Sequence, residues 1–212
     1  MSKSSVRKPN RLKNYDYSQK GAYFITICVK DKHEILGKIV PVGAITNRPS
    51  IYYTNRPNTN QSSINQSKNR PHNNHQQNET ADKLHVELSE YGMIVDTAIN
   101  EIPVHYKNVS VDRYVIMPNH IHLILVIQNN NEIQHYNATQ HNVGNGRLLI
   151  APTCVSNIVK QLKRYVSKQL GFSLWQKSFH DHIIRNEKEY CQIVEYIENN
   201  PSRWVNDCYY KP

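Results

Sequence analysis

Two histidines separated by one residue stand in the most apolar stretch of the chain, YVIMPNHIHLILVI at residues 114–127. Because side chains alternate between the faces of a strand, His120 and His122 share one face and Ile121 points to the other. Imidazoles about 6–7 Å apart along a strand can converge on one divalent ion. Pro118 marks a strand start or a bulge, where sites are often built, and this favours a metal site. Two surface histidines on a half-exposed sheet are the competing interpretation.

A tyrosine near the C-terminal end has a spacing that could serve the same site. Tyr196 and Asn200 are four residues apart in EYIENNP, so both lie on one face of a predicted helix. Ile193 and Ile197 lie on a neighbouring face and are expected to dock the helix. The chain has 14 tyrosines, so a half-buried aromatic with its hydroxyl in water is an alternative interpretation of Tyr196.

The charge of the chain indicates an anionic partner. Its 212 residues carry a formal net charge of +9 at pH 7, and nucleic acid is the first candidate partner. A soluble protein that is merely basic fits the charge equally well. The four cysteines form no C-x-x-C pair, which argues against a zinc ribbon and a disulfide scaffold. Because no stretch resembles a signal peptide or a membrane span, we expect a cytoplasmic protein.

The elements that must position these residues follow from hydrophobic periodicity. Strands are predicted at 21–30, 109–118, 120–127 and 174–185, and a short hairpin is predicted from 35–42 and 83–88. Helices are predicted at 88–103, 155–171 and 186–201, with Ser89 as a cap and with Pro103, Gly171 and Pro201 as stops. The first helix is expected to dock through Met93, Ile94, Thr97, Ala98 and Ile102, and the second through Val155, Ile158, Val159, Leu162, Val166 and Leu170. The order predicts an α+β fold, a ferredoxin-like βαββαβ unit with a four-stranded antiparallel sheet and an added C-terminal helix.

Two polar segments interrupt this single predicted domain of residues 1–212. The first, at 46–82, is dominated by Asn, Gln, Ser and Pro, and it cannot bury enough apolar surface to offset its ordering entropy. We therefore expect a long flexible insertion there. The second segment, at 128–152, is predicted to be a polar loop.

Four segments together resemble a REP-associated tyrosine transposase, a branch of the single-tyrosine HUH transposases. They are YVIMPNHIHLILVI, KRYVSKQLG, LWQKSFHDHIIRNEKEY and EYIENNP. The resemblance covers about residues 12–45 and 84–205. It implies the ferredoxin-like fold and an enzyme that cleaves and rejoins single-stranded DNA at or near hairpins. In related enzymes the tyrosine helix serves its own subunit or a partner's, so a homodimer is compatible with the resemblance.

The resemblance also implies the roles of the site residues. Tyr196 would be the nucleophile that forms a 5′-phosphotyrosine, and His120 and His122 would hold Mg²⁺ or Mn²⁺. Many relatives place a further polar ligand, often Gln, one helical turn after the nucleophile, where this chain has Asn200. A tyrosine hydroxyl has a pKa near 10, so it needs an electropositive site and a polarised phosphate to react.

DNA binding is expected from the basic side of the helix at 155–171. The candidate residues are Lys160, Lys163, Arg164, Lys168 and, in the last strand region, Arg185. A solvated helix face is the competing interpretation of each single lysine. Two other functions fit the predicted fold: a non-catalytic single-stranded nucleic-acid-binding module, and a replication-initiator or relaxase domain.

Overall fold

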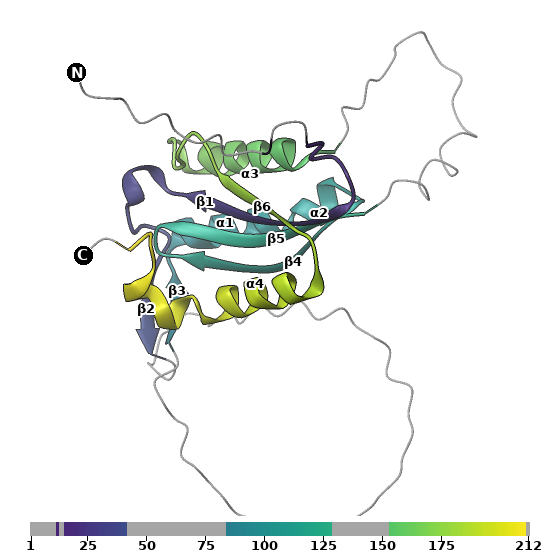
Figure 1. The fold of residues 1–212 in the computed structure, drawn as a ribbon. Helices are drawn as coiled ribbons and strands as arrows, with labels where there is room; N and C mark the ends of the chain where they lie inside the picture. The colour runs from purple at the N-terminus through teal and green to yellow at the C-terminus, as the bar shows by residue number, and fades with distance from the viewer. Residues whose placement is uncertain (1–11, 13–14, 42–83, 129–152, 211–212) are drawn as a thin grey trace, which may run out of the picture.

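The described part of the chain forms one four-stranded antiparallel sheet. The computed structural model describes residue 12 and residues 15–41, 84–128 and 153–210. The strands are β1 (Gly21–Cys28), β4 (Val109–Met117), β5 (His120–Ile127) and β6 (His180–Ile184), in the order β4-β5-β1-β6. With helices between β1 and β4 and between β5 and β6, this order is the predicted ferredoxin-like arrangement, and that prediction is confirmed (Figure 1).

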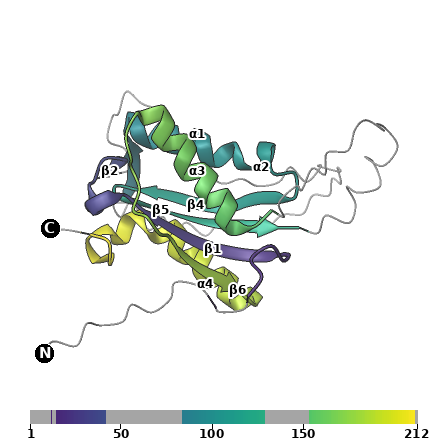
Figure 2. The same cartoon turned by 90° about the horizontal axis from the view of Figure 1, so that it is seen from above.

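Helices lie on both faces of the sheet. One face is covered by α1 (Glu90–Asn100) and α3 (Val155–Leu170), and α4 (Glu187–Asn199) lies on the other face (Figures 1 and 2). Alternate residues of the central strands point into the core under α1 and α3, among them Tyr23, Ile25, Ile27, Ile121, Leu123 and Leu125. Because side chains alternate along a strand, His120 and His122 point to the face of α4.

A short hairpin joins β1 to α1. It consists of β2 (Gly37–Pro41) and β3 (Leu84–Leu88), which pair antiparallel as predicted. Ser89 caps α1 by accepting a hydrogen bond from the backbone N–H of Gly92 at 3.1 Å. An added Cβ at Gly92 would lie 2.0 Å from the carbonyl oxygen of Leu36. Only glycine therefore allows this close approach between the hairpin and the helix.

Some predicted boundaries and faces were wrong. The first helix ends at Asn100, and Pro103 lies inside the short helix α2 (Ile102–His105), where the first helical turn tolerates a proline. The side of α1 that faces the core is also rotated from the predicted stripe, since Met93 and Thr97 are exposed while Val95 and Ile99 are fully buried. Among the predicted core residues of this segment, Ala98 and Ile102 are buried.

The C-terminal elements are shorter than predicted. The last strand begins at His180 instead of residue 174, with only an isolated bridge between Val29 and Trp175 before it. Pro201 ends α4 and also begins the 3-10 helix η3 (Pro201–Asn206). The helix α3 keeps its predicted bounds and its buried stripe, and Gly171 ends it in the left-handed conformation at φ 76°.

The segments predicted at 46–82 and 128–152 lie outside the described residues, apart from Gln128. No helix in the described ranges combines the length and the apolar character needed to cross a membrane.

A candidate site of two histidines, an aspartate and a tyrosine

The two histidines of β5 face each other at close range. Their Nε2 atoms are 3.0 Å apart, and the side chains of His120 and His122 are 0% and 1% exposed. The predicted placement of both imidazoles on one strand face is therefore observed. Two nitrogens that bind one ion at about 2.1 Å in adjacent octahedral positions would lie about 3.0 Å apart, so this spacing fits a shared divalent ion.

The outer nitrogen of each ring has its own protein partner. Asn119 directs its amide N–H groups to the carbonyl oxygens of Lys32 and Tyr209, at 3.3 and 2.9 Å. Its Oδ1 must therefore accept a hydrogen bond from Nδ1–H of His120 at 2.9 Å. In the neutral ring Nε2 then carries no proton, and its lone pair is available to bind a metal. On the second histidine, Nδ1 of His122 lies 2.8 Å from Oγ1 of Thr26. Partners of this kind orient the histidines of metal sites.

Protonation does not compete strongly for these nitrogens. Burial lowers the pKa of His120 to about 3, and the nearby Lys32 ammonium adds to this effect. Burial also lowers the pKa of His122 well below its ordinary value, with a further contribution from His120. Both rings are therefore neutral near pH 7, and neutral imidazole is the form that binds metals.

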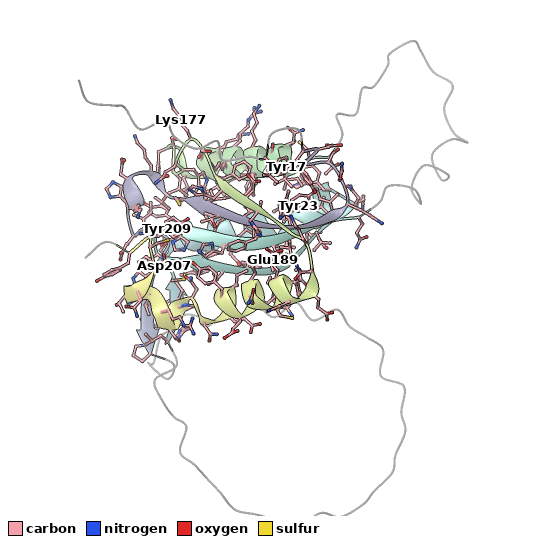
Figure 3. All side chains as sticks on the ribbon, viewed as in Figure 1. Tyr17, Tyr23, Lys177, Glu189, Asp207 and Tyr209 are labelled. Carbon is pink, nitrogen blue, oxygen red and sulfur yellow. The ribbon has the colours of Figure 1, made fainter. Side chains whose placement is uncertain are left out.

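An aspartate completes the group. Atoms of His120, His122 and Asp207 that could bind a metal all lie within 4.8 Å of one another. Asp207 follows η3, and Figure 3 shows it beside Tyr209 at the same end of the sheet as the C-terminal segment. Asp207 was not predicted as a site residue, because it lies after the last predicted helix, in a stretch without periodicity. The only signal was an acidic residue shortly after Pro201.

Asn200, the predicted third ligand, lies next to this aspartate. Its side chain is 2% exposed, and its Nδ2 donates a hydrogen bond to Oδ2 of Asp207 at 3.1 Å. The Oδ1 atom of Asn200 is buried without a hydrogen-bond partner. Since carboxylates bind Mg²⁺ and Mn²⁺ more strongly than a neutral amide does, Asp207 fits the third ligand better, and the ligand role of Asn200 stays a prediction.

The tyrosine of α4 reaches the same point. Its hydroxyl oxygen is 3.3 Å from Nε2 of His122 and 3.3 Å from Oδ2 of Asp207. Ile197 is buried and docks α4 as predicted, whereas Tyr196 itself is 37% exposed. Burial raises the pKa of Tyr196 to about 12, and the Asp207 carboxylate adds to the rise. Without a cation nearby, this phenol is a weaker nucleophile than free tyrosine.

Aromatic side chains surround the histidines. The centroid of the Tyr209 ring lies 4.5 Å from that of the His120 ring, and the centroid of the Trp204 ring lies 6.0 Å from it. Lys32 fixes this segment, because its ammonium donates to the carbonyl oxygen of Cys208 at 3.0 Å and lies over the Tyr209 ring. The two histidines are thus buried beside aromatic rings, and low exposure to water strengthens electrostatic interactions there.

The predicted DNA-binding residues do not gather at this site. Lys160, Arg164 and Lys168 are exposed on α3, on the sheet face opposite to the histidines. Lys163 donates to the carbonyl oxygens of Gln176 and Ser178 at 2.8 and 2.6 Å, and burial lowers its pKa to about 8. Arg185 is exposed at the turn between β6 and α4, at the opposite end of α4 from Tyr196. Their DNA-binding roles stay predictions.

Comparison with known proteins identifies similar chains. An uncharacterized protein of Haemophilus influenzae is 31% identical over 215 residues, which cover 96% of this chain and 93% of the Haemophilus protein. Among solved structures, a REP-associated tyrosine transposase bound to a REP hairpin is similar with a TM-score of 0.50 and 15% sequence identity, over 92% of this chain and 74% of the transposase chain. No family model matches the sequence.

Proposed function

We propose that this chain, which belongs to the same family as the Haemophilus influenzae protein and has the fold of the REP-associated tyrosine transposase, cleaves and rejoins single-stranded DNA through Tyr196. The observation that carries the proposal is the position of the Tyr196 hydroxyl. It lies 3.3 Å from a buried imidazole nitrogen and 3.3 Å from a carboxylate oxygen, both of which could bind a metal. An ion bound there would lie next to the phenol, which is where a metal-assisted nucleophile must stand.

The reaction would be a phosphoryl transfer to the phenol. The Tyr196 oxygen attacks a backbone phosphorus, an O–P bond forms, and the bond from phosphorus to the 3′ oxygen of the preceding nucleotide breaks. Asp207 is placed to accept the phenolic proton, because the Tyr196 hydroxyl donates to it. The 3′ oxygen leaves as a hydroxyl after taking a proton. Attack by a 3′-hydroxyl on the tyrosyl link reverses these steps, so the strand is rejoined.

The residues present fit a divalent ion. His120 and His122 would hold Mg²⁺ or Mn²⁺ through their Nε2 atoms, with the Asp207 carboxylate as the third ligand. The ion would polarise the phosphate and stabilise the phenolate of Tyr196. Asn200 would hold the carboxylate of Asp207 in place, and its buried Oδ1 remains available as a polar contact.

The proposed partner is hairpin or single-stranded DNA. The similar transposase structure contains a REP hairpin, and the net charge of +9 on this chain suits a polyanion. The exposed cations of α3 would then contact a part of the DNA away from Tyr196. The helix α4 packs on the sheet of its own chain, so we propose that Tyr196 serves its own subunit, whether the protein is a monomer or a homodimer.

A covalent adduct tests this function. The protein is incubated with single-stranded hairpin DNA and Mn²⁺, and mass spectrometry detects DNA linked to a tyrosine. We expect the adduct on Tyr196, its absence in Tyr196→Phe, and unchanged formation in the matched control Tyr165→Phe, whose ring is exposed on α3. A non-catalytic binding module would retain the DNA but form no adduct, so absence of an adduct under all metal conditions would favour that alternative.

A further inference from the structure

The sheet face that carries the histidines is only partly covered by described residues. The helix α4 packs over the edge strand β4, and β1 and β6 form the other half of this face. The strand register places Phe24 of β1 directly opposite His182 of β6 in that half. His180 and His182 are exposed there. This open half begins beside Tyr196, the proposed nucleophile.

Phe24 lies on the border between the covered and the open half. Its ring is stacked on the His122 ring, with centroids 5.2 Å apart and an interplanar angle of 25°. Its centroid is 6.1 Å from that of Tyr196, and the centroids of His122 and Tyr196 are 5.2 Å apart. The three ring centroids therefore form a nearly equilateral triangle. Seen from the Phe24 centroid, the directions to His122 and to Tyr196 differ by much less than a right angle. The ring face of Phe24 that is turned away from His122 is therefore covered by neither of them.

We propose that this second ring face of Phe24 is a stacking platform for one base of the DNA, the base next to the phosphate that Tyr196 attacks. The inference rests on the proposed function and names a contact that the cleavage chemistry does not require. Aromatic side chains hold single strands by stacking on bases, whatever the base, because every base has a flat π face. Since the same ring contacts His122 and Tyr196, a stacked base would be held at a fixed distance from both.

The surroundings of Phe24 suit a DNA strand. Glu189, the acidic residue where α4 begins, is already engaged by two donors from the protein. It accepts from Nε2 of His182 at 2.6 Å and from the backbone N–H of Arg185 at 2.8 Å. Its repulsion of a phosphate is thereby reduced, while the Arg185 side chain remains exposed just before the start of α4.

The test compares two DNA probes of equal charge. Fluorescein-labelled dT20 and a 20-mer of the same backbone without bases are titrated with the full chain in EDTA, which prevents cleavage, and anisotropy gives both affinities. The ratio of the two affinities reports base stacking alone, since both probes carry the same phosphates. Phe24→Leu keeps an apolar contact with His122 but lacks a π face. We expect it to lower the ratio roughly five- to 150-fold, the range for one stacked base.

Two further variants sharpen the test. Phe24→Trp should keep or increase the preference for dT20. Phe172→Leu should leave it unchanged, because Phe172 is an exposed aromatic beyond the end of α3 that packs against Tyr91 of α1, whereas Phe24 is half-buried on β1. An unchanged ratio in Phe24→Leu, or a lost preference in Phe24→Trp, would overturn the platform. The adduct assay with Mn²⁺ separates this proposal from the cleavage function. If Tyr196 forms an adduct but the affinity ratio does not depend on Phe24, the cleavage function stands and the platform is overturned. If the affinity ratio depends on Phe24 but no adduct forms, cleavage is overturned and Phe24 is a binding site for a base.

Discussion

The hydroxyl of Tyr190 donates a hydrogen bond to Oδ2 of Asp112, and this contact ties α4 to the edge strand of its own sheet. Arg113 adds a second link, since its Nε lies 3.7 Å from the Glu198 carboxylate on the same helix. Burial raises the pKa of Tyr190 to about 12, and its hydrogen bond to Asp112 adds to the rise. The helix that carries Tyr196 is thus anchored on both sides of that residue, by Tyr190 somewhat less than two turns before it and by Glu198 shortly after it.

Removal of this anchor should loosen the helix. We expect Tyr190→Phe to lower the free energy of unfolding by about 1–2 kcal/mol, because Asp112 loses a charge-assisted hydrogen bond. Adduct formation should slow at the same time, since Tyr196 is held less firmly. Urea denaturation measures the first effect and a single-turnover adduct assay the second. Tyr165→Phe, on an exposed face, should change stability by less than about 0.5 kcal/mol.

The third metal ligand can be identified by affinity. Asp207→Asn should weaken Mn²⁺ binding strongly, because a neutral amide replaces a charged ligand, whereas Asn200→Ala should have a smaller effect through the misplaced carboxylate. Calorimetric titration with Mn²⁺ measures both, with the exposed Glu195→Gln as a matched loss of charge. A larger effect of Asn200→Ala than of Asp207→Asn would support the ligand that the resemblance implies.

The hydrogen bond behind His122 should matter for the metal. Thr26→Val keeps the side-chain volume but removes the oxygen that meets Nδ1 of His122, so the ring loses the partner that orients it. We expect Mn²⁺ affinity to fall roughly 10- to 100-fold, as is usual for such outer partners. Thr97→Val on the exposed side of α1 is the control. Equal affinities of the two variants would contradict this role of Thr26.

Stability should depend on pH through the buried histidines. The folded pKa of His120 is about 3 and that of an exposed histidine about 6.5, so the unfolded chain binds more protons between these values. The contribution of His120 is therefore complete above about pH 6.5 and is lost as the pH falls toward 3, by up to about 1.4 kcal/mol per pH unit. Denaturation in EDTA at pH 7 and pH 5 measures the loss. His120→Asn should reduce it, and an unchanged loss would contradict the assignment.

The cations of α3 should act on DNA affinity and leave the chemistry intact. Replacement of Lys160, Arg164 and Lys168 by Ala should weaken hairpin binding and reduce the slope of log affinity against log salt by about 2–3, as expected for three phosphate contacts. Because these residues lie on the opposite sheet face, the rate of adduct formation at saturating DNA should stay within about twofold. Anisotropy titrations at several salt concentrations measure the affinity and its salt dependence, and the adduct assay measures the rate.

Local patterns predicted most of the fold, and the gaps in the prediction are those that depend on long-range pairing. Strand alternation placed His120 and His122 on one face, and helical spacing placed Tyr196 on a face next to the side that docks. The partners across the sheet were not predictable from local sequence: Thr26 meets His122 only through the register of β1 and β5. The same holds for Phe24, whose neighbours are set by that register. Asp207 was missed because an aperiodic turn brings it back to the sheet.

The metal candidates come from two distant parts of the chain, since β5 supplies the histidines and the turn after η3 supplies Asp207. An ion bound by all three would act as a reversible cross-link that no unfolded chain can form. The melting temperature should therefore climb with the concentration of Mn²⁺, in proportion to the logarithm of its excess over the dissociation constant, and a chelator should lower it again. The same coordination that prepares the phosphate for attack would then also fasten the last turns of the protein to its central strands.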